Sequence, residues 1–172
     1  GIKYTYRLIC KFQKIDENFD VAVSYMQNSA YKYFYGGCNE FVLNSVKADK
    51  KISFLHCDFK NYYGNNMYNR SLYQKFDKVA CVSDSCRKVF LEVCPDYKDK
   101  AVTVHNFYDI LDIKNKSLEY APNFKKDSFN VFTCARISPE KGIMRVIPII
   151  SKLKTEGFNV NWYVAGDGEQ LD

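Results

Sequence analysis

Short apolar runs alternate with stretches of helical character along most of this chain, and this alternation restricts the fold more than any other feature. Strands joined through helices normally pair in parallel, through right-handed crossovers. The sequence therefore predicts an α/β protein with Rossmann-like parallel sheets. The first of the runs is compact and apolar, so we expect it to be a buried strand. The predicted strands are residues 19–25, 51–56, 78–83, 101–104, 129–135 and 160–165.

The segment 107–128 differs from the rest of the chain because it is polar and only weakly periodic, and it contains Pro122. We interpret it as a connector between two domains, an N-terminal α/β domain over residues 1–106 and a second one over residues 129–172. The chain starts without Met and stops soon after the last predicted strand. We therefore expect the first domain to lack its start and the second to be only begun.

Composition excludes some classes of protein. The charge of +5 is spread among acidic residues rather than gathered in a stripe, which argues against a nucleic-acid partner. It still permits phosphate-bearing ligands or peripheral contact with an anionic membrane face. Seven cysteines without a Cys-x-x-Cys pair, and no signal peptide or membrane-spanning run, predict a cytoplasmic protein with reduced, mostly buried thiols.

The strongest candidate binding motif follows the strand at 129–135. Arg136 comes next, and we expect a helix to open at Pro139 with Ser138 as its N-cap. Amide groups at a helix start attract anions, and Arg and Lys bind phosphate, so Arg136 and Lys141 suit a diphosphate. Gly142 would let the backbone approach it closely. The alternative is that both cations are ordinary solvated charges.

Two further features lie at predicted strand ends. His56 follows the strand at 51–56, where it could contact a reacting sugar or phosphate, or could equally be a core or turn histidine. Gly166 and Gly168 follow the last strand, where they would leave room for a ligand or form an ordinary turn. No His, Cys and carboxylate cluster has ligand spacing, so we expect no metal site.

Six motifs in this order resemble those of retaining glycosyltransferases of family four, also called group one, which have the two-domain GT-B fold. The similarity extends over nearly the whole chain and crosses the predicted domain boundary. Single motifs are weak, but their order is fairly specific. The motifs are residues 19–25, 52–56, 79–83, 102–109, 136–142 and 162–168.

The resemblance implies a cleft between an N-terminal acceptor domain and a C-terminal domain that binds a sugar nucleotide. Arg136, Lys141 and Gly142 match the positions that hold the donor's diphosphate without a metal. Gly166 and Gly168 match the turn that lines the donor site.

The resemblance also implies roles for one residue near the transferred sugar and for two residues at the start of the connector. His56 matches a residue beside the transferred sugar, and Asn106 and Asp109 match the signature that enters the connector. The family's glycine-rich loop and its pair of glutamates are absent from this stretch, so we expect these residues alone to be inactive.

The expected function is transfer of a hexosyl group from a nucleotide-diphosphate sugar, a UDP-sugar by default, to a surface-glycan or lipid-linked acceptor. Such an enzyme would build bacterial capsule or lipopolysaccharide at the inner face of the cell membrane, with no cofactor. A sugar-nucleotide epimerase is a weaker enzymatic alternative. The alternative from another class is a non-catalytic α/β nucleotide-binding or interaction module.

Overall fold

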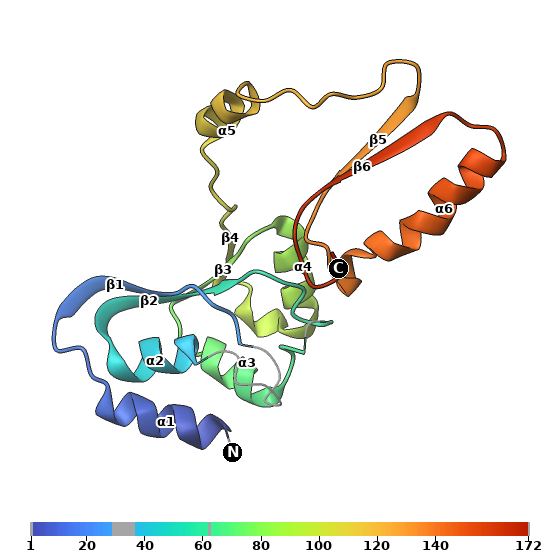
Figure 1. The fold of residues 1–172 in the computed structure, drawn as a ribbon. Coiled ribbons are helices and arrows are strands. Elements are labelled where there is room, and N and C mark those ends of the chain that lie inside the picture. The colour runs from blue at the N-terminus through green and yellow to red at the C-terminus, as the bar shows by residue number, and fades with distance from the viewer. Residues whose placement is uncertain (1, 29–36, 62, 172) are drawn as a thin grey trace. The chain divides into compact units, whose positions relative to one another are not determined.

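The chain forms two compact units, Gly1–Tyr108 (unit 1) and Asp109–Asp172 (unit 2), in a computed structural model that describes residues 2–28, 37–61 and 63–171 (Figure 1). The division falls within the segment that the sequence predicts as a connector. That segment is not simply extended, because its first half contains the helix α5, Ile110–Ser117.

Unit 1 is built on a four-stranded sheet in which every neighbouring pair is parallel, as the alternation of strands and helices predicts. The strand order follows the chain, so β1 and β4 are the edge strands. The second strand begins earlier than predicted, at Lys47. The strands are β1 (Asn18–Ser24), β2 (Lys47–Leu55), β3 (Lys78–Cys81) and β4 (Ala101–Thr103).

Polar side chains cap the N-termini of two helices of unit 1, α3 and α4. Ser83 accepts a hydrogen bond from the Cys86 amide at 3.1 Å and so opens α4. Asn66 caps α3 in the same way through the Asn69 amide. The helices are α1 (Ile2–Phe12), α2 (Cys38–Ser45), α3 (Met67–Tyr73), α4 (Asp84–Val93) and the short 3-10 turn η1 (Pro95–Tyr97).

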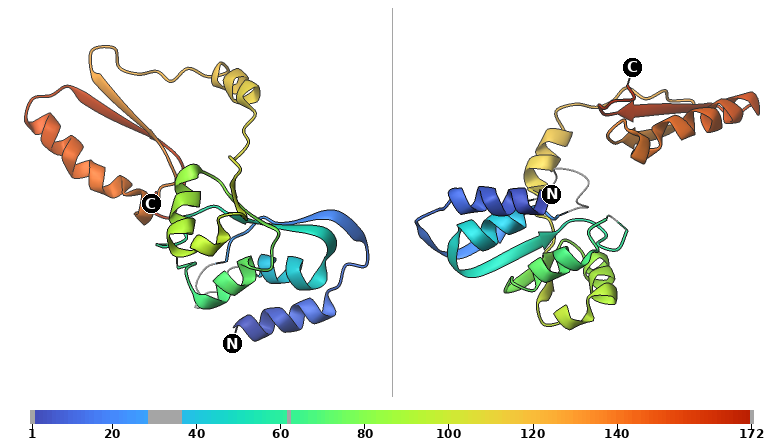
Figure 2. Two further views of the ribbon diagram at one scale, coloured as in Figure 1. Left: turned by 180° about the vertical axis from the view of Figure 1, so that it is seen from behind. Right: turned by 90° about the horizontal axis from the view of Figure 1, so that it is seen from below.

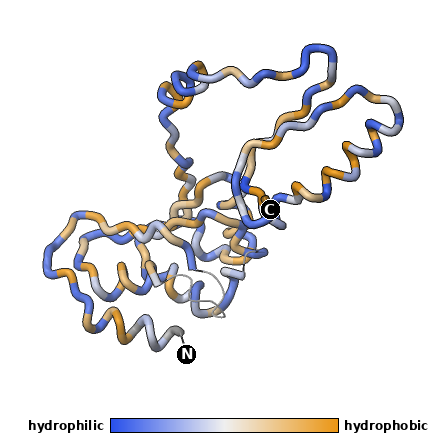
Figure 3. Tube along the Cα trace, viewed as in Figure 1, coloured by the Kyte–Doolittle hydropathy of each residue, from blue (hydrophilic) through white to orange (hydrophobic). Residues whose placement is uncertain are grey.

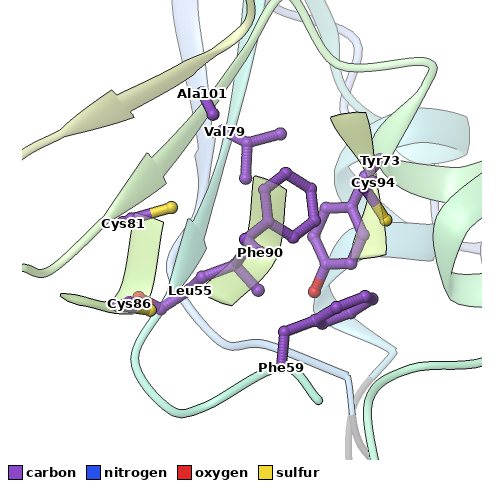
Figure 4. Close-up of a cluster of buried hydrophobic side chains, with 9 residues drawn as sticks. All are labelled: Leu55, Phe59, Tyr73, Val79, Cys81, Cys86, Phe90, Cys94 and Ala101. Carbon is purple, nitrogen blue, oxygen red and sulfur yellow. Dashed lines mark hydrogen bonds between the residues drawn. The ribbon is translucent and has the colours of Figure 1, made fainter. Parts of the chain in front are cut away.

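The core of unit 1 lies between the sheet and α3 and α4 (Figure 4). Phe90 of α4 is completely buried, and its ring meets those of Phe59 and Tyr73 edge to face, with centroids 5.2 and 5.9 Å apart. Such pairs add to the stabilisation from burial. The other members of this cluster are Leu55, Val79, Cys81, Cys86, Cys94 and Ala101.

The two faces of this sheet are covered differently. The packed helices α2, α3 and α4 contact one face, and α2 and α3 lie on the same side of the sheet in Figures 1 and 2. Ala22 and Ser24 of β1 point to that face and are buried. Phe19, Val21 and Val23 point the other way and are 42–49% exposed. The prediction that this run is a buried strand is therefore wrong, because β1 is an edge strand with one face packed.

Unit 2 contains a parallel pair of strands, β5 (Phe129–Cys134) and β6 (Val160–Ala165), joined through the helix α6 (Ile143–Thr155). The helix runs through Pro148 and ends before Gly157, whose φ is 91°. Hydrophobic and hydrophilic residues alternate along it (Figure 3). This strand–helix–strand unit supplies the turn that holds the candidate site.

Candidate functional site

The turn between β5 and α6 places the predicted diphosphate-binding residues together. Arg136 leaves the end of β5, and residues Pro139–Lys141 form a single 3-10 turn, η2. A helical turn does open at Pro139 after Ser138, as predicted, but it is a 3-10 turn, and the helix α6 starts only at Ile143. The cause is Gly142, whose φ of 67° lies in the left-handed region and separates η2 from α6.

Gly142 is therefore important for its backbone conformation. A Cβ atom at this position would meet nothing closer than the Arg145 Cδ atom at 3.6 Å, which is an ordinary contact. The restriction comes from the left-handed φ, which costs an L-residue with a side chain roughly 1–2 kcal/mol. The prediction gave the glycine a different reason, close approach to a ligand.

The turn is held in place by the segment after β6. The Ile137 amide donates to the Asp167 carbonyl at 2.8 Å, and the Gln170 amide donates to the Ile137 carbonyl at 3.1 Å. Ile137 and Ser138 are buried, as is Ile143 at the start of α6. The polar turn therefore has a fixed backbone, which a preorganised binding site requires.

Gly166 and Gly168 make this close packing possible. A Cβ atom on Gly166 would lie 1.9 Å from the Ala135 carbonyl oxygen, and one on Gly168 would lie 2.2 Å from the Ile137 carbonyl oxygen. The predicted room for a ligand at these glycines is instead filled by backbone. Their part in the site is to let the two turns meet.

The cationic side chains of the turn are exposed. The Arg136 side chain is 72% exposed, and its Nη1 atom lies 3.6 Å from Oε1 of Glu140. Lys141 is also exposed. The pKa of the Glu140 carboxyl lies below its usual range, first because the Ser138 hydroxyl faces it and also because Arg136 and Lys141 are nearby. The Ser138 contact falls short of full hydrogen-bond geometry, and within the described part of the chain this buried hydroxyl has no other partner.

These groups together suit an anion. The first amide groups of a helix have no partner within the helix, and the helix dipole adds positive potential there. A planar guanidinium and a flexible ammonium stand beside the start of the 13-residue α6. Together they can bind a phosphate or diphosphate.

His56 lies in unit 1, directly after β2, at the carboxyl edge where the sequence places it. Its Nε2 atom is 2.7 Å from the Tyr25 carbonyl oxygen, and its amide donates to Gln27 Oε1 at 2.9 Å. Because a carbonyl can only accept, Nε2 must carry the hydrogen. In the neutral ring Nδ1 is then the free acceptor. The His56 ring also contacts the rings of Tyr25 and Phe54.

Asn106 and Asp109 lie on the segment after β4, and both are exposed. The Asp109 carboxylate accepts a hydrogen bond from the Asp112 amide at 2.9 Å and caps α5. Its observed contact is therefore a helix cap. Asn106 belongs to unit 1 and Asp109 opens unit 2.

The described residues lack the features of two other classes of site. Within residues 2–28, 37–61 and 63–171, no group of three or more His, Cys, Asp and Glu side chains is placed to hold a metal ion. In the same parts of the chain, no helix combines the length and the apolar character that crossing a membrane requires. Most of the thiols are buried, as the sequence predicts, since those of Cys10, Cys81, Cys86 and Cys94 are inaccessible, whereas the Cys134 thiol is exposed.

The chain was compared with known protein families and with curated proteins. No family model matches it, and no curated protein matches it significantly. The resemblance to glycosyltransferases therefore depends on the six ordered motifs alone.

The sequence indicates no role for Glu140, and for Ser138 it predicts only the role of a helix cap. Ser138 occupies the residue before η2, but its hydroxyl makes no cap hydrogen bond. Glu140 is four residues after Arg136 and pairs with it. That spacing was the only signal in the sequence, and it is common on solvated helix faces.

Proposed function

We propose that this chain is part of a retaining glycosyltransferase of the GT-B type, and that residues 136–143 bind the diphosphate of its sugar-nucleotide donor. One observation carries the proposal: exposed Arg136 and Lys141 stand beside the start of α6, on a turn whose backbone is fixed by burial and hydrogen bonds. The order of the six motifs supports the choice of reaction.

The chemistry of the turn suits a nucleoside diphosphate as leaving group. When the bond between sugar and phosphate breaks, negative charge develops on the phosphate oxygens. A guanidinium fork and an ammonium group can stabilise that charge without a metal ion. Arg136 and Lys141 supply these two groups.

In this proposal His56 contacts the transferred hexosyl group. Its Nε2 atom is committed to the Tyr25 carbonyl, so Nδ1 would accept a hydrogen bond from a sugar hydroxyl. Asn106 and Asp109 belong to the segment that joins the two domains. The donor would be a UDP-sugar and the acceptor a surface glycan or a lipid-linked glycan at the cytoplasmic face of a bacterial membrane.

Calorimetric titration of the 172-residue chain with UDP tests the binding step. Because charge-assisted hydrogen bonds contribute about 1.5–3 kcal/mol, Arg136→Ala and Lys141→Ala should each weaken binding about 10- to 100-fold. Lys152→Ala is the matched control, since Lys152 is 77% exposed near the opposite end of α6. Equal UDP affinity in the wild type and in both site variants would overturn the proposal.

A further inference from the structure

The carboxylate of Glu140 lies among the groups that would bind a phosphate. Its Oε1 atom is 3.6 Å from Nη1 of Arg136, within the same turn. The buried Ser138 hydroxyl and the backbone amide of Glu140 also lie close enough to it to lower its pKa. Guanidinium, hydroxyl and backbone N–H groups are the donors that proteins use for phosphate oxygens. The side chain thus takes the position of an anionic ligand.

The charged form of Glu140 is favoured in this position. Contact with Ser138, the backbone amide and the two nearby cations all lower the pKa of its carboxyl. Glu140 is therefore ionised at neutral pH, and its negative charge stands directly beside Arg136. A nucleotide that uses the same guanidinium has to separate this pair or share Arg136 with it.

We propose that Glu140 is an internal anion that occupies Arg136 in the empty site and competes with the nucleoside diphosphate. This inference rests on the proposed function of the turn. A nucleotide phosphate can reach this ion pair and replace Glu140 on Arg136, because the side chains of Arg136 and Glu140 are 72% and 58% exposed. The neighbouring residues Ile137 and Ser138 of the same turn are buried.

Removing the charge of Glu140 should strengthen UDP binding, whereas removing Arg136 or Lys141 should weaken it. Glu140→Gln keeps the size of the side chain and removes its charge. UDP should bind this variant about two- to fivefold more tightly than the wild type, the range expected from loss of an exposed ion pair.

Unit 2 offers a matched control for this change. Glu156 pairs with Lys152 at 3.8 Å with the same four-residue spacing, near the opposite end of α6. Glu156→Gln also removes one negative charge, but at the C-terminal end of α6 instead of before its start. It should change UDP affinity by less than about twofold, because exposed charges separated by more than a Debye length of about 8 Å are largely screened at 0.15 M salt.

Titration of wild type, E140Q, E156Q and R136A with UDP under one salt condition separates the outcomes. Tighter binding to E140Q alone is the expected result. Weaker binding to E140Q would make Glu140 a residue that positions Arg136, and an equal gain in E156Q would make the effect general electrostatics, so either result overturns the inference. If R136A still binds UDP more weakly than the wild type, either of these results leaves the proposed function of the turn intact. Absence of UDP binding to wild type and E140Q alike overturns both proposals.

Discussion

The two units of the chain differ in which residues they bury. Unit 1 buries large rings such as Phe59, Tyr73 and Phe90 against its sheet, so its buried residues form a core. In the described part of unit 2, the buried residues are few, and three of them belong to the turn or to the start of α6 that follows it. They are Ile137, Ser138, Ile143 and, on β6, Val160.

This difference indicates where each unit tolerates change. In unit 1 the cost of a substitution should follow the volume removed from the core. In unit 2 the cost should follow the distance from the turn at 136–143, because the best-packed residues of the unit support the candidate site. Substitutions in the two units can therefore break or sharpen this contrast.

The largest effect should come from Phe90→Ala in unit 1. The ring is fully buried and contacts Phe59, Tyr73 and Tyr97, so the substitution leaves a cavity. We expect the free energy of unfolding to fall by about 3–5 kcal/mol, measured from urea unfolding followed by far-UV circular dichroism.

The matched change in unit 2 is Phe129→Ala, since Phe129 opens β5 and is 74% exposed. It should lower stability by less than about 1 kcal/mol, because little apolar surface leaves water at this site. A loss in Phe129→Ala as large as that in Phe90→Ala would break the contrast between the units.

Gly166→Ala should give an intermediate effect, confined to unit 2. Its Cβ atom would lie 1.9 Å from the Ala135 carbonyl oxygen, so the backbone must move. Overpacking of this kind costs about 1–3 kcal/mol. The single tryptophan, Trp162, lies on β6, and its fluorescence follows unfolding of this unit.

The same variant should also weaken UDP binding, because the turn at 136–143 loses its support. Gly157→Asn is the control, since Gly157 has open space around it and Asn tolerates its positive φ. Unchanged stability and UDP affinity in Gly166→Ala would show that the packing of the two turns does not hold the site.

Tyr73 of unit 1 should give the smallest effect at neutral pH, together with a pH dependence in the alkaline range. Burial raises the pKa of Tyr73, whose hydroxyl lies beside Asn28 and Asn39 without a hydrogen bond of full geometry. Folding therefore favours the neutral phenol. This contribution is intact below the ordinary pKa of 10.0 and is lost as the pH rises above it, by about 1.4 kcal/mol per pH unit.

Tyr73→Phe removes this titration. At pH 7 its stability should equal that of the wild type within about 1 kcal/mol, because the hydroxyl makes no strong bond there. Above pH 10 the variant should be the more stable protein in urea unfolding. A parallel decline of wild type and variant from pH 9 to pH 11 would contradict the assignment to Tyr73.

Much of the fold could be predicted because strand and helix boundaries have local causes. Ser83 caps α4, and the apolar runs at residues 129–134 and 160–165 became the parallel pair β5 and β6. The burial of β1 could not be predicted, because an apolar run does not reveal whether its strand is at an edge. The helix α5 was missed because it is short, lies in a weakly periodic segment and packs no buried side chain.

The candidate site was predicted in its residues but not in its geometry. Arg136 and Lys141 could be found because a strand followed by basic residues and a helix start is a local pattern. The left-handed conformation of Gly142 and the contact of Gly166 with Ala135 depend on how separate segments pack. The pairing of Glu140 with Arg136 also depends on the shape of the turn.

The central claim is that residues 136–143 bind the diphosphate of a nucleotide, and amide chemical shifts test it most directly. A ¹⁵N-labelled sample of the chain is titrated with UDP and followed by two-dimensional NMR. The account predicts that the largest shifts fall on the amides of Arg136, Lys141, Gly142 and Ile143, and that they disappear in Arg136→Ala. Shifts centred in unit 1, or shifts at the turn that persist in Arg136→Ala, would contradict it.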